Sequence, residues 1–314
     1  MRILILLIGI VVALASCSRS VTQKDFASPE DATQALVAAA RADDTRALIE
    51  VLGPDAAPVV DSADPVRDRN ARARFVEAYE AAHTFEKTAD GPTTLHVGTD
   101  NWPFPFPLLQ RGGRWSFDSS AGAEEIINRR VGENELDAIQ ACLAFVDAER
   151  EYFWRNPQRE PLLQYAQKLE SSAGRKDGLY WQTSADELPS PLGEQFARAR
   201  SEGYFQEGVT ATTGRPYRGY VYRLLTAQGS SAKGGAYDYL VSGKMIGGFA
   251  LIAVPAEYGT SGVMTFIVNH EGVVYSKDLG DDTAKTANAI AAFDPDSSWK
   301  REAAIEPGLQ ASTP

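Results

Sequence analysis

The pattern of apolar residues changes once along this chain, near residue 203, and that change most constrains its fold. Before it, apolar residues recur mainly three and four positions apart, as in amphipathic helices. After it, short apolar and β-branched runs are separated by glycine-containing turns, which is typical of antiparallel strands. The sequence therefore predicts an α+β protein: a helical N-terminal unit with a small antiparallel sheet, a helical middle, and a C-terminal antiparallel β-sheet.

The N-terminal α+β unit is expected over residues 26–132. Ser28 followed by Pro29 predicts a helix start, because serine caps the first free N–H groups and proline fits the first helical position. A hairpin is predicted to turn at Gly112 and Gly113. The other predicted elements of this unit are helices over 44–52 and 65–83 and strands over 93–97, 108–111 and 114–118.

The helical middle is expected over residues 133–203. A helix over 124–130 is predicted to end at Gly132, and Asn134 to cap a second, amphipathic helix of about five turns that ends at Asn156. Further helices are predicted over 161–169 and 190–202.

The C-terminal β-rich unit is expected over residues 204–300, followed by a disordered tail over 301–314. Its clearest strand is the nearly continuous apolar run 249–254, which suits a strand buried on both faces. Strands are also predicted over 219–226, 263–268 and 273–275.

The first seventeen residues have the layout of an export signal. Arg2 precedes a ten-residue apolar run, 3–12, which is too short for a membrane-spanning helix of about 20 residues. Leu-Ala-Ser before Cys17 is similar to a bacterial lipobox. We therefore expect a signal peptide over 1–16, lipidation of Cys17, and a short tether over 17–25.

Charge and cysteine content narrow the range of partners. The chain has 31 basic and 42 acidic side chains, a net charge of −11, so the phosphates of nucleic acids would repel it. Its attachment to a membrane is expected to come from acyl chains on Cys17. The second cysteine, Cys142, has no partner within the chain once Cys17 is lipidated, and we interpret it as a buried core residue.

Strong signatures of catalysis or metal binding are lacking in the sequence. The histidines are isolated, and the string at Asp294 departs from a calcium loop at its sixth and twelfth positions. Ser190 lacks the flanking glycines of a nucleophile elbow. Ser230 and Lys233 form an S-x-x-K string in a glycine-flanked loop without its companion motifs. We expect no metal and no cofactor.

Two aromatic groups are the candidates for binding. Residues 102–107 alternate aromatics with prolines, which fix an extended backbone; this segment either forms an exposed ridge or lines a core, and burial is the favoured reading. The tyrosines near residues 217–258, with nearby cations, suit sugars, peptides or a protein partner, and cross-strand packing explains them about as well. The possible binding surface comprises Trp102, Phe104, Tyr220, Tyr222, Arg223 and Tyr239.

Long strings of the sequence, among them WPFPFPLLQRGGRWSFD and SGVMTFIVNHEGVVYSKDLG, resemble the DUF2950 family of exported bacterial proteins of unknown function. The resemblance extends from about Phe26 to Trp299 and implies no activity, ligand or catalytic residue. The last hairpins are also similar to the C-terminal sheet of some type IV pilin-like proteins, although a cleaved signal would remove the apolar helix on which pilin assembly depends.

The leading hypothesis is a non-enzymatic, lipid-anchored binding or structural module of the cell envelope. Ser18 after the lipidated cysteine favours the outer membrane over retention in the inner membrane, with the protein facing the periplasm. The expected partner is an envelope protein or a cell-wall component. The alternatives are an envelope hydrolase with an unidentified active site and a pilin-like assembly or secretion accessory.

Overall fold

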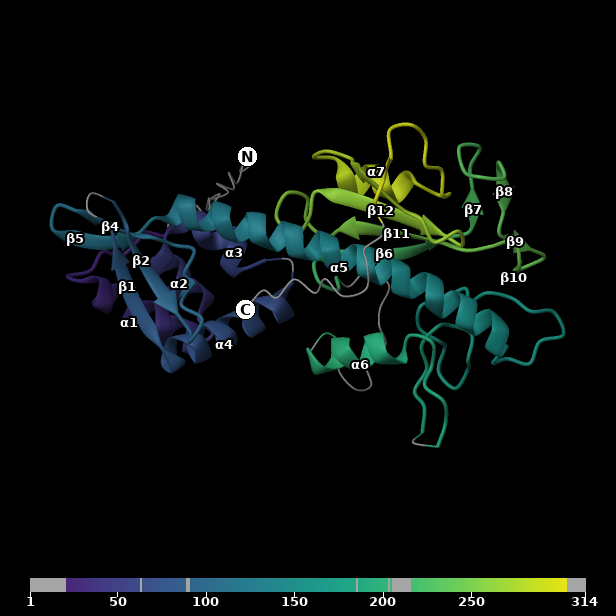
Figure 1. Ribbon diagram of the computed structural model, residues 1–314, viewed down its shortest axis with the longest axis horizontal. Helices are drawn as coiled ribbons and strands as arrows, with labels where there is room; N and C mark the ends of the chain where they lie inside the picture. Colours follow the sequence, from purple (N-terminus) through teal and green to yellow (C-terminus); the bar gives the residue numbers. More distant parts are fainter. Residues whose placement is uncertain are drawn as a thin grey trace, which may run out of the picture.

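The computed structural model describes residues 21–303, apart from 63, 89–90, 185, 203 and 205–215. The predicted signal peptide, Cys17 and residues 304–314 of the predicted tail lie outside the described residues. The tail prediction, 301–314, is wrong at its start, because Arg301 pairs with Tyr275 in the C-terminal sheet. One long helix, α5 (Ser119–Arg155), runs from an N-terminal unit to a C-terminal sheet in an elongated molecule (Figure 1). The α+β class predicted from the sequence is confirmed.

The N-terminal helices begin where the sequence predicts. Side chains of Ser28, Asp44 and Asp64 accept hydrogen bonds from backbone N–H groups in the first turns of α1, α2 and α4, which satisfies donors that a helix leaves free. The helical elements of this unit are α1 (Pro29–Arg41), α2 (Thr45–Leu52), the 3-10 turn η1 (Pro54–Ala56), α3 (Ala57–Val60) and α4 (Pro65–Ala81).

A small antiparallel sheet completes this unit, in the order β1-β2-β4-β5 with β3 paired to β2. The predicted hairpin is present: Gly112 and Gly113 both have positive φ, 57° and 79°, as its tight turn requires. The prediction of a helix over 65–83 is wrong at its end, because His83 begins strand β1. The strands are β1 (His83–Lys87), β2 (Thr93–Val97), β3 (Trp102–Pro103), β4 (Leu108–Arg111) and β5 (Arg114–Phe117).

Helix α5 has no break at Gly132, which corrects the prediction of two helices. Gly132 is exposed and helical, and Asn134 is 1 % exposed inside the helix, where it serves as a contact residue and caps nothing. The helix ends at Asn156, as predicted, in a left-handed conformation. The first part of α5 packs Ala123 into the N-terminal core, and the second part packs Cys142 and Phe145 into the C-terminal core.

The helix predicted over 161–169 is also wrong, since that segment is irregular. Its backbone bonds elsewhere: Tyr165 N donates to Met245 O at 2.8 Å, and Ala166 N donates to the Glu149 carboxylate at 2.8 Å. These tertiary bonds replace the i to i−4 bonds of a helix. Helix α6 (Gly193–Ser201) follows at the predicted place.

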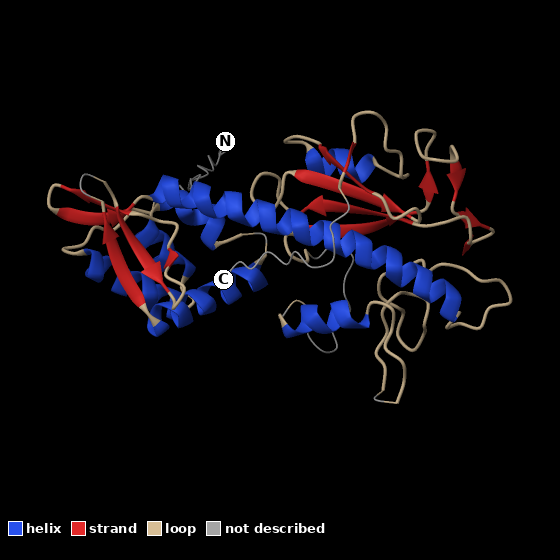
Figure 2. Cartoon of the chain, in the orientation of Figure 1, coloured by secondary structure: helices blue, strands red, loops and turns tan. Residues whose placement is uncertain are grey.

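The C-terminal sheet is antiparallel, in the order β14-β13-β12-β11-β6, and its clearest predicted strand, β11, is interior. Helix α5 packs against β11, β12 and β13, and α7 (Thr283–Ala289) packs against β11; Figures 1 and 2 show these helices on opposite sides of the sheet. The strands are β6 (Tyr220–Leu225), β11 (Ala250–Pro255), β12 (Met264–Asn269), β13 (Val274–Asp278) and β14 (Lys300–Arg301), with short pairs β7 (Ala227–Gln228) with β8 (Tyr237–Asp238) and β9 (Leu240–Val241) with β10 (Lys244–Met245).

Burial in this core raises the pKa of the Cys142 thiol to about 12, so the cysteine is a packing residue, as expected. None of the described helices is both long and apolar enough to cross a membrane.

Candidate functional site

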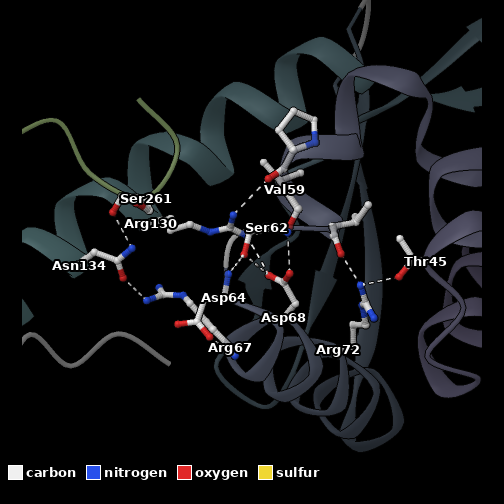
Figure 3. Close-up of polar contacts among 12 residues, drawn as sticks. Thr45, Val59, Ser62, Asp64, Arg67, Asp68, Arg72, Arg130, Asn134 and Ser261 are labelled. Carbon is white, nitrogen blue, oxygen red and sulfur yellow. Dashed lines mark hydrogen bonds and ion pairs between the residues drawn. The ribbon is translucent and has the colours of Figure 1, made fainter. Parts of the chain in front are cut away.

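A polar joint fixes helix α5 against both units of the molecule. We use the name joint for Asp64, Arg67, Asp68, Arg130, Asn134 and Ser261, which Figure 3 shows. Arg67 on α4 donates to Asn134 Oδ1 and to the Glu133 carboxylate. Asn134 Nδ2 donates to the carbonyl oxygen of Ser261 at 2.8 Å. One side chain of α5 therefore connects the N-terminal unit to the loop between β11 and β12.

The joint also holds a buried pair of charges. Arg130 and Asp68 are 8 % and 6 % exposed, and Arg130 Nη2 lies 3.7 Å from Asp68 Oδ1. Arg130 donates to Val59 O at 2.7 Å, and Asp68 accepts from the backbone N–H and the hydroxyl of Ser62 at 2.7 and 2.8 Å. Buried charges with this many partners are satisfied, so the joint is a structural connection.

The end of α6 is attached to the same place. Tyr204 donates its hydroxyl to Asp64 Oδ2 at 2.6 Å, and Asn70 Nδ2 donates to Glu202 O at 2.8 Å. Arg218 pairs with Asp137 on α5 at 2.8 Å and also with Glu202. Both α5 and α6 are thus held at the joint.

Between α5 and the start of α6 lies a groove with a volume of about 470 Å³. We call it the α5 groove. On one side it is lined by the α5 stripe from Gln140 to Arg155, in which Leu143 and Ala148 also pack toward the C-terminal core. On the other side it is lined by residues 189–191 and 194–195.

Local contacts explain why this second wall stands apart from α5. Pro189 fixes φ in the extended part of the wall, and Pro191 lies in a turn closed by the Gly193 N–H donating to Ser190 O at 2.7 Å. Leu192 is buried, with its N–H donating to Leu179 O at 3.0 Å. The wall meets α5 at Arg155, whose Nη1 donates to the Pro189 carbonyl. That contact joins the wall to the C-terminal end of the α5 stripe.

The lining combines an apolar floor with carboxylates. Leu143, Ala144, Ala148 and the two prolines supply the apolar part. Asp147, Glu151 and Glu194 supply the carboxylates, against one guanidinium, Arg155, which is already paired with Glu151. The Asp147 side chain is 81 % exposed and lies 3.6 Å from Arg150. The α5 groove therefore has an excess of negative charge.

Ser190 in the groove wall is 4 % exposed, and its hydroxyl has no hydrogen-bond partner among the described residues. A nucleophilic serine needs a base within hydrogen-bond reach, and none contacts Ser190 in the described part of the chain.

Exposed apolar side chains lie where the wall meets α5, next to Arg155 and Pro189 in the chain. Trp154 is 77 % exposed and follows Asp147 by seven residues, so it lies on nearly the same face of α5. Its ring packs edge-on against Phe153, 5.4 Å between centroids. Leu188, 73 % exposed, directly precedes Pro189. Exposed apolar groups beside a groove are a mark of binding surfaces.

The three tyrosines assigned to the possible binding surface are packed in the C-terminal unit. Tyr220 and Tyr239 are both 0 % exposed, and the hydroxyl of Tyr222 is buried. Arg223 donates to the carbonyl oxygens of Ala287 and Ile290, both at 2.9 Å, and so satisfies the C-terminal end of α7. These residues pack and support the sheet, and the structure does not bring them together as a binding surface.

The aromatic–proline segment lies against the N-terminal core. Phe106 is 0 % exposed, and the half-buried ring of Phe104 packs 5.0 Å from that of Phe75. The Arg129 guanidinium lies 5.1 Å from the Trp102 ring centroid. The favoured reading of burial therefore describes this segment better than an exposed ridge.

Sequence reasoning missed the α5 groove, although one signal was available. The predicted apolar face of this helix included Leu143, Val146 and Phe153, and Trp154 falls outside it. A large aromatic on the polar face of a helix is unusual and could have pointed to this surface. The described residues contain no group of three or more metal-ligating side chains.

Comparison with known proteins gives a family and no activity. No curated protein and no solved structure matches the chain, so the likeness to pilin sheets stays a prediction. A family model described as "Protein of unknown function (DUF2950)" matches residues 23–302, which include both units, the joint and the α5 groove. The chain belongs to the DUF2950 family.

Proposed function

We propose that this chain is a lipid-anchored protein of the bacterial cell envelope, facing the periplasm from the outer membrane, that binds a partner protein through the α5 groove. The observation that carries the binding role is the α5 groove itself, with its unpaired buried hydroxyl at Ser190 and the exposed ring of Trp154 nearby. A rigid, concave surface with a few placed polar groups is the usual form of a binding site.

The anchoring role is supported by how early the fold begins. Gln23 donates to the carbonyl oxygens of Leu52 and Phe117 at 3.0 and 2.8 Å, and Lys24 N donates to Glu50 O at 2.7 Å. The expected tether is therefore shorter than 17–25. Six Cα–Cα steps separate Cys17 from Gln23, at most about 22 Å of extended chain. An acylated Cys17 would hold the N-terminal unit close to the membrane.

Anchoring is tested by fractionating cells that express the natural chain or Cys17→Ser. We expect the natural chain in the outer-membrane fraction and the variant in the soluble periplasmic fraction, because the acyl chains supply the attachment. Ser18→Ala is the matched control and stays with the membrane. Equal membrane retention of Cys17→Ser would overturn the lipid anchor.

Binding is tested with a photo-crosslinking amino acid placed in living cells at Gln140 or Gln195, both of which line the groove. The control position is Glu77, an exposed residue of α4 in the N-terminal unit. We expect discrete protein adducts from the two groove positions and none from the control. Adducts from all three positions, or from none, would contradict a partner site in the groove.

A further inference from the structure

The α5 groove has a charge imbalance that indicates the chemistry of its occupant. Of its charged lining, the guanidinium of Arg155 is used by the Pro189 carbonyl and by Glu151. Glu194 has no hydrogen-bond or ion-pair partner within the described residues, and Asp147 is largely exposed, with Arg150 3.6 Å away as its partner. These carboxylates can accept hydrogen bonds from an ammonium or guanidinium group of a ligand.

The floor of the groove favours a cation that carries an aliphatic stem. Leu143 and Ala144 are half-buried and present apolar surface in the groove, whereas Ala148 is 2 % exposed and adds little to it. Lysine and arginine side chains bury their methylene groups on such a surface while their charged ends reach polar partners. A small inorganic cation would leave this apolar surface uncovered.

Ser190 is a second, independent indication of a ligand. Its side chain is 96 % buried in the groove wall, and its hydroxyl oxygen lacks a partner among the described residues. Buried polar atoms are normally hydrogen-bonded, so an orphaned hydroxyl in the wall of a groove indicates a partner that the described residues do not supply.

The spacing of the carboxylates matches an extended peptide. Asp147 and Glu151 are four residues apart on α5, a rise of about 6 Å. Alternate side chains of an extended chain lie on one face, about 6.6 Å apart. The lining stripe of α5 from Gln140 to Arg155 is about 22 Å long, the length of about seven extended residues.

We propose that the α5 groove binds an extended segment of a partner protein that carries lysine or arginine at alternate positions. This rests on the proposed binding function and adds the chemistry of the partner to it. The cationic ends pair with Glu194 and replace Arg150 and Arg155 as partners of Asp147 and Glu151, the stems cover the apolar floor, and the peptide supplies a hydrogen bond to Ser190.

The test uses the purified full-length chain in detergent and two fluorescein-labelled heptapeptides, Ser-Lys-Ser-Lys-Ser-Lys-Ser and Ser-Ser-Lys-Lys-Lys-Ser-Ser, in a fluorescence anisotropy titration. The peptides have the same composition and charge and differ only in lysine spacing. We expect the alternating peptide to bind at least fivefold more tightly. Equal binding of both peptides, or equal competition by the polyamine spermidine, would overturn the proposal.

Matched variants connect the binding to the groove. Glu151→Gln combined with Glu194→Gln is expected to weaken binding of the alternating peptide at least tenfold, and Ser190→Ala at least threefold. The control, Glu30→Gln combined with Glu77→Gln, removes two exposed carboxylates of the N-terminal unit and is expected to change binding less than twofold. Equal weakening by the control pair would mean that only net charge attracts the peptide.

The experiments distinguish a failure of the basic-peptide proposal from a failure of the proposed binding function. If crosslinks form at Gln140 and Gln195 while the groove variants leave peptide binding unchanged, the groove binds a partner of other chemistry and this inference is wrong. If the crosslinks are absent, the binding function itself fails. Thermal unfolding of each variant identifies any loss caused by misfolding, and Glu151→Gln alone supplies a milder substitution.

Discussion

The two cores that share helix α5 are built from different kinds of residue. The N-terminal core is rich in small side chains, among them Ala32, Ala39 and Ala40, which let its helices pack closely. The C-terminal core is filled by large rings, including Phe145, Phe249 and Phe266. The N-terminal core also buries rings, at Phe106 and Phe117, so the difference is one of proportion: aromatic area contributes more to the C-terminal core.

The largest expected effect is in the aromatic core. Phe249 is 0 % exposed, and its ring lies 5.5 Å from Phe145 and 4.8 Å from Tyr165. We expect Phe249→Ala to lower the free energy of unfolding by about 3–5 kcal/mol, because it removes buried area and leaves a cavity. The matched change in the alanine-rich core, Ala40→Gly, is expected to cost about 1 kcal/mol. Urea unfolding measures both; similar costs would erase the contrast between the cores.

The next effect concerns the joint between the cores. Asp68→Ala leaves the buried guanidinium of Arg130 without its carboxylate, and we expect a loss of about 3 kcal/mol. The unfolding curve should also broaden, because the N-terminal unit loses a contact with α5. Glu77→Ala, at an exposed position of the same helix, is the control and should stay within about 0.5 kcal/mol of the natural chain. A single sharp transition at unchanged denaturant concentration would show that the joint does not couple the units.

A smaller expected effect is a pH dependence of stability that comes from the C-terminal core, at the buried carboxyl of Glu149. Burial raises the pKa of Glu149 well above its usual value, and its Oε1 has no partner in the described structure. The groups around it include Tyr152, Tyr165 and Arg150, and the N–H of Ala166 donates to its other oxygen.

In the folded chain the Glu149 carboxyl keeps its proton at pH values where the unfolded chain has released it. The contribution of Glu149 to the free energy of unfolding is therefore fully present below the usual carboxyl pKa of about 4.5. This contribution is lost as the pH rises toward the raised pKa of the folded chain. Glu149→Gln has no proton to release, so we expect it to stabilise the protein by about 1–2 kcal/mol at pH 8 and to leave stability at pH 4 nearly unchanged. Thermal unfolding across this range checks the prediction, with Glu77→Gln as control. A natural chain more stable at pH 8 than at pH 5 would oppose it.

The smallest expected effect on stability is at Trp154. Its ring is 77 % exposed, so Trp154→Ser should change the free energy of unfolding by less than about 0.5 kcal/mol. Photo-crosslinking at Gln140 is nevertheless expected to fall, because exposed tryptophans often anchor partners. Trp115→Ser in the N-terminal unit is the comparison and should leave crosslinking intact. Unchanged crosslinking after Trp154→Ser would exclude this ring from the binding surface.

Elements with local signals were predictable from the sequence. Ser28 with Pro29, and the glycine pair at 112–113, determine a helix start and a turn through their own backbone preferences. The continuity of α5 was not predictable in this way. Gly132 and Asn134 have the composition of a helix boundary, whereas in the fold they lie where α5 changes from one core to the other, and tertiary contacts override local propensity.

The candidate site was the least predictable part. Its walls come from α5 and from a proline-containing segment more than 30 residues away, and no motif relates them. Tyr220 and Tyr239 were attractive in sequence because tyrosine can serve either a core or a surface. Their placement depends on how α5 crosses the sheet, which only the assembled fold determines.

The unbroken course of α5 also sets a rule for how this family can change length. A helix advances by about 100° and 1.5 Å per residue, so one residue inserted near Gly132 would rotate the C-terminal sheet by more than a quarter turn relative to the N-terminal unit. Asn134 could then no longer reach both Arg67 and Ser261. Insertions of seven residues nearly restore the angle. Natural length variation in this chain should therefore occur in the loops, while the middle of α5 keeps its residue count.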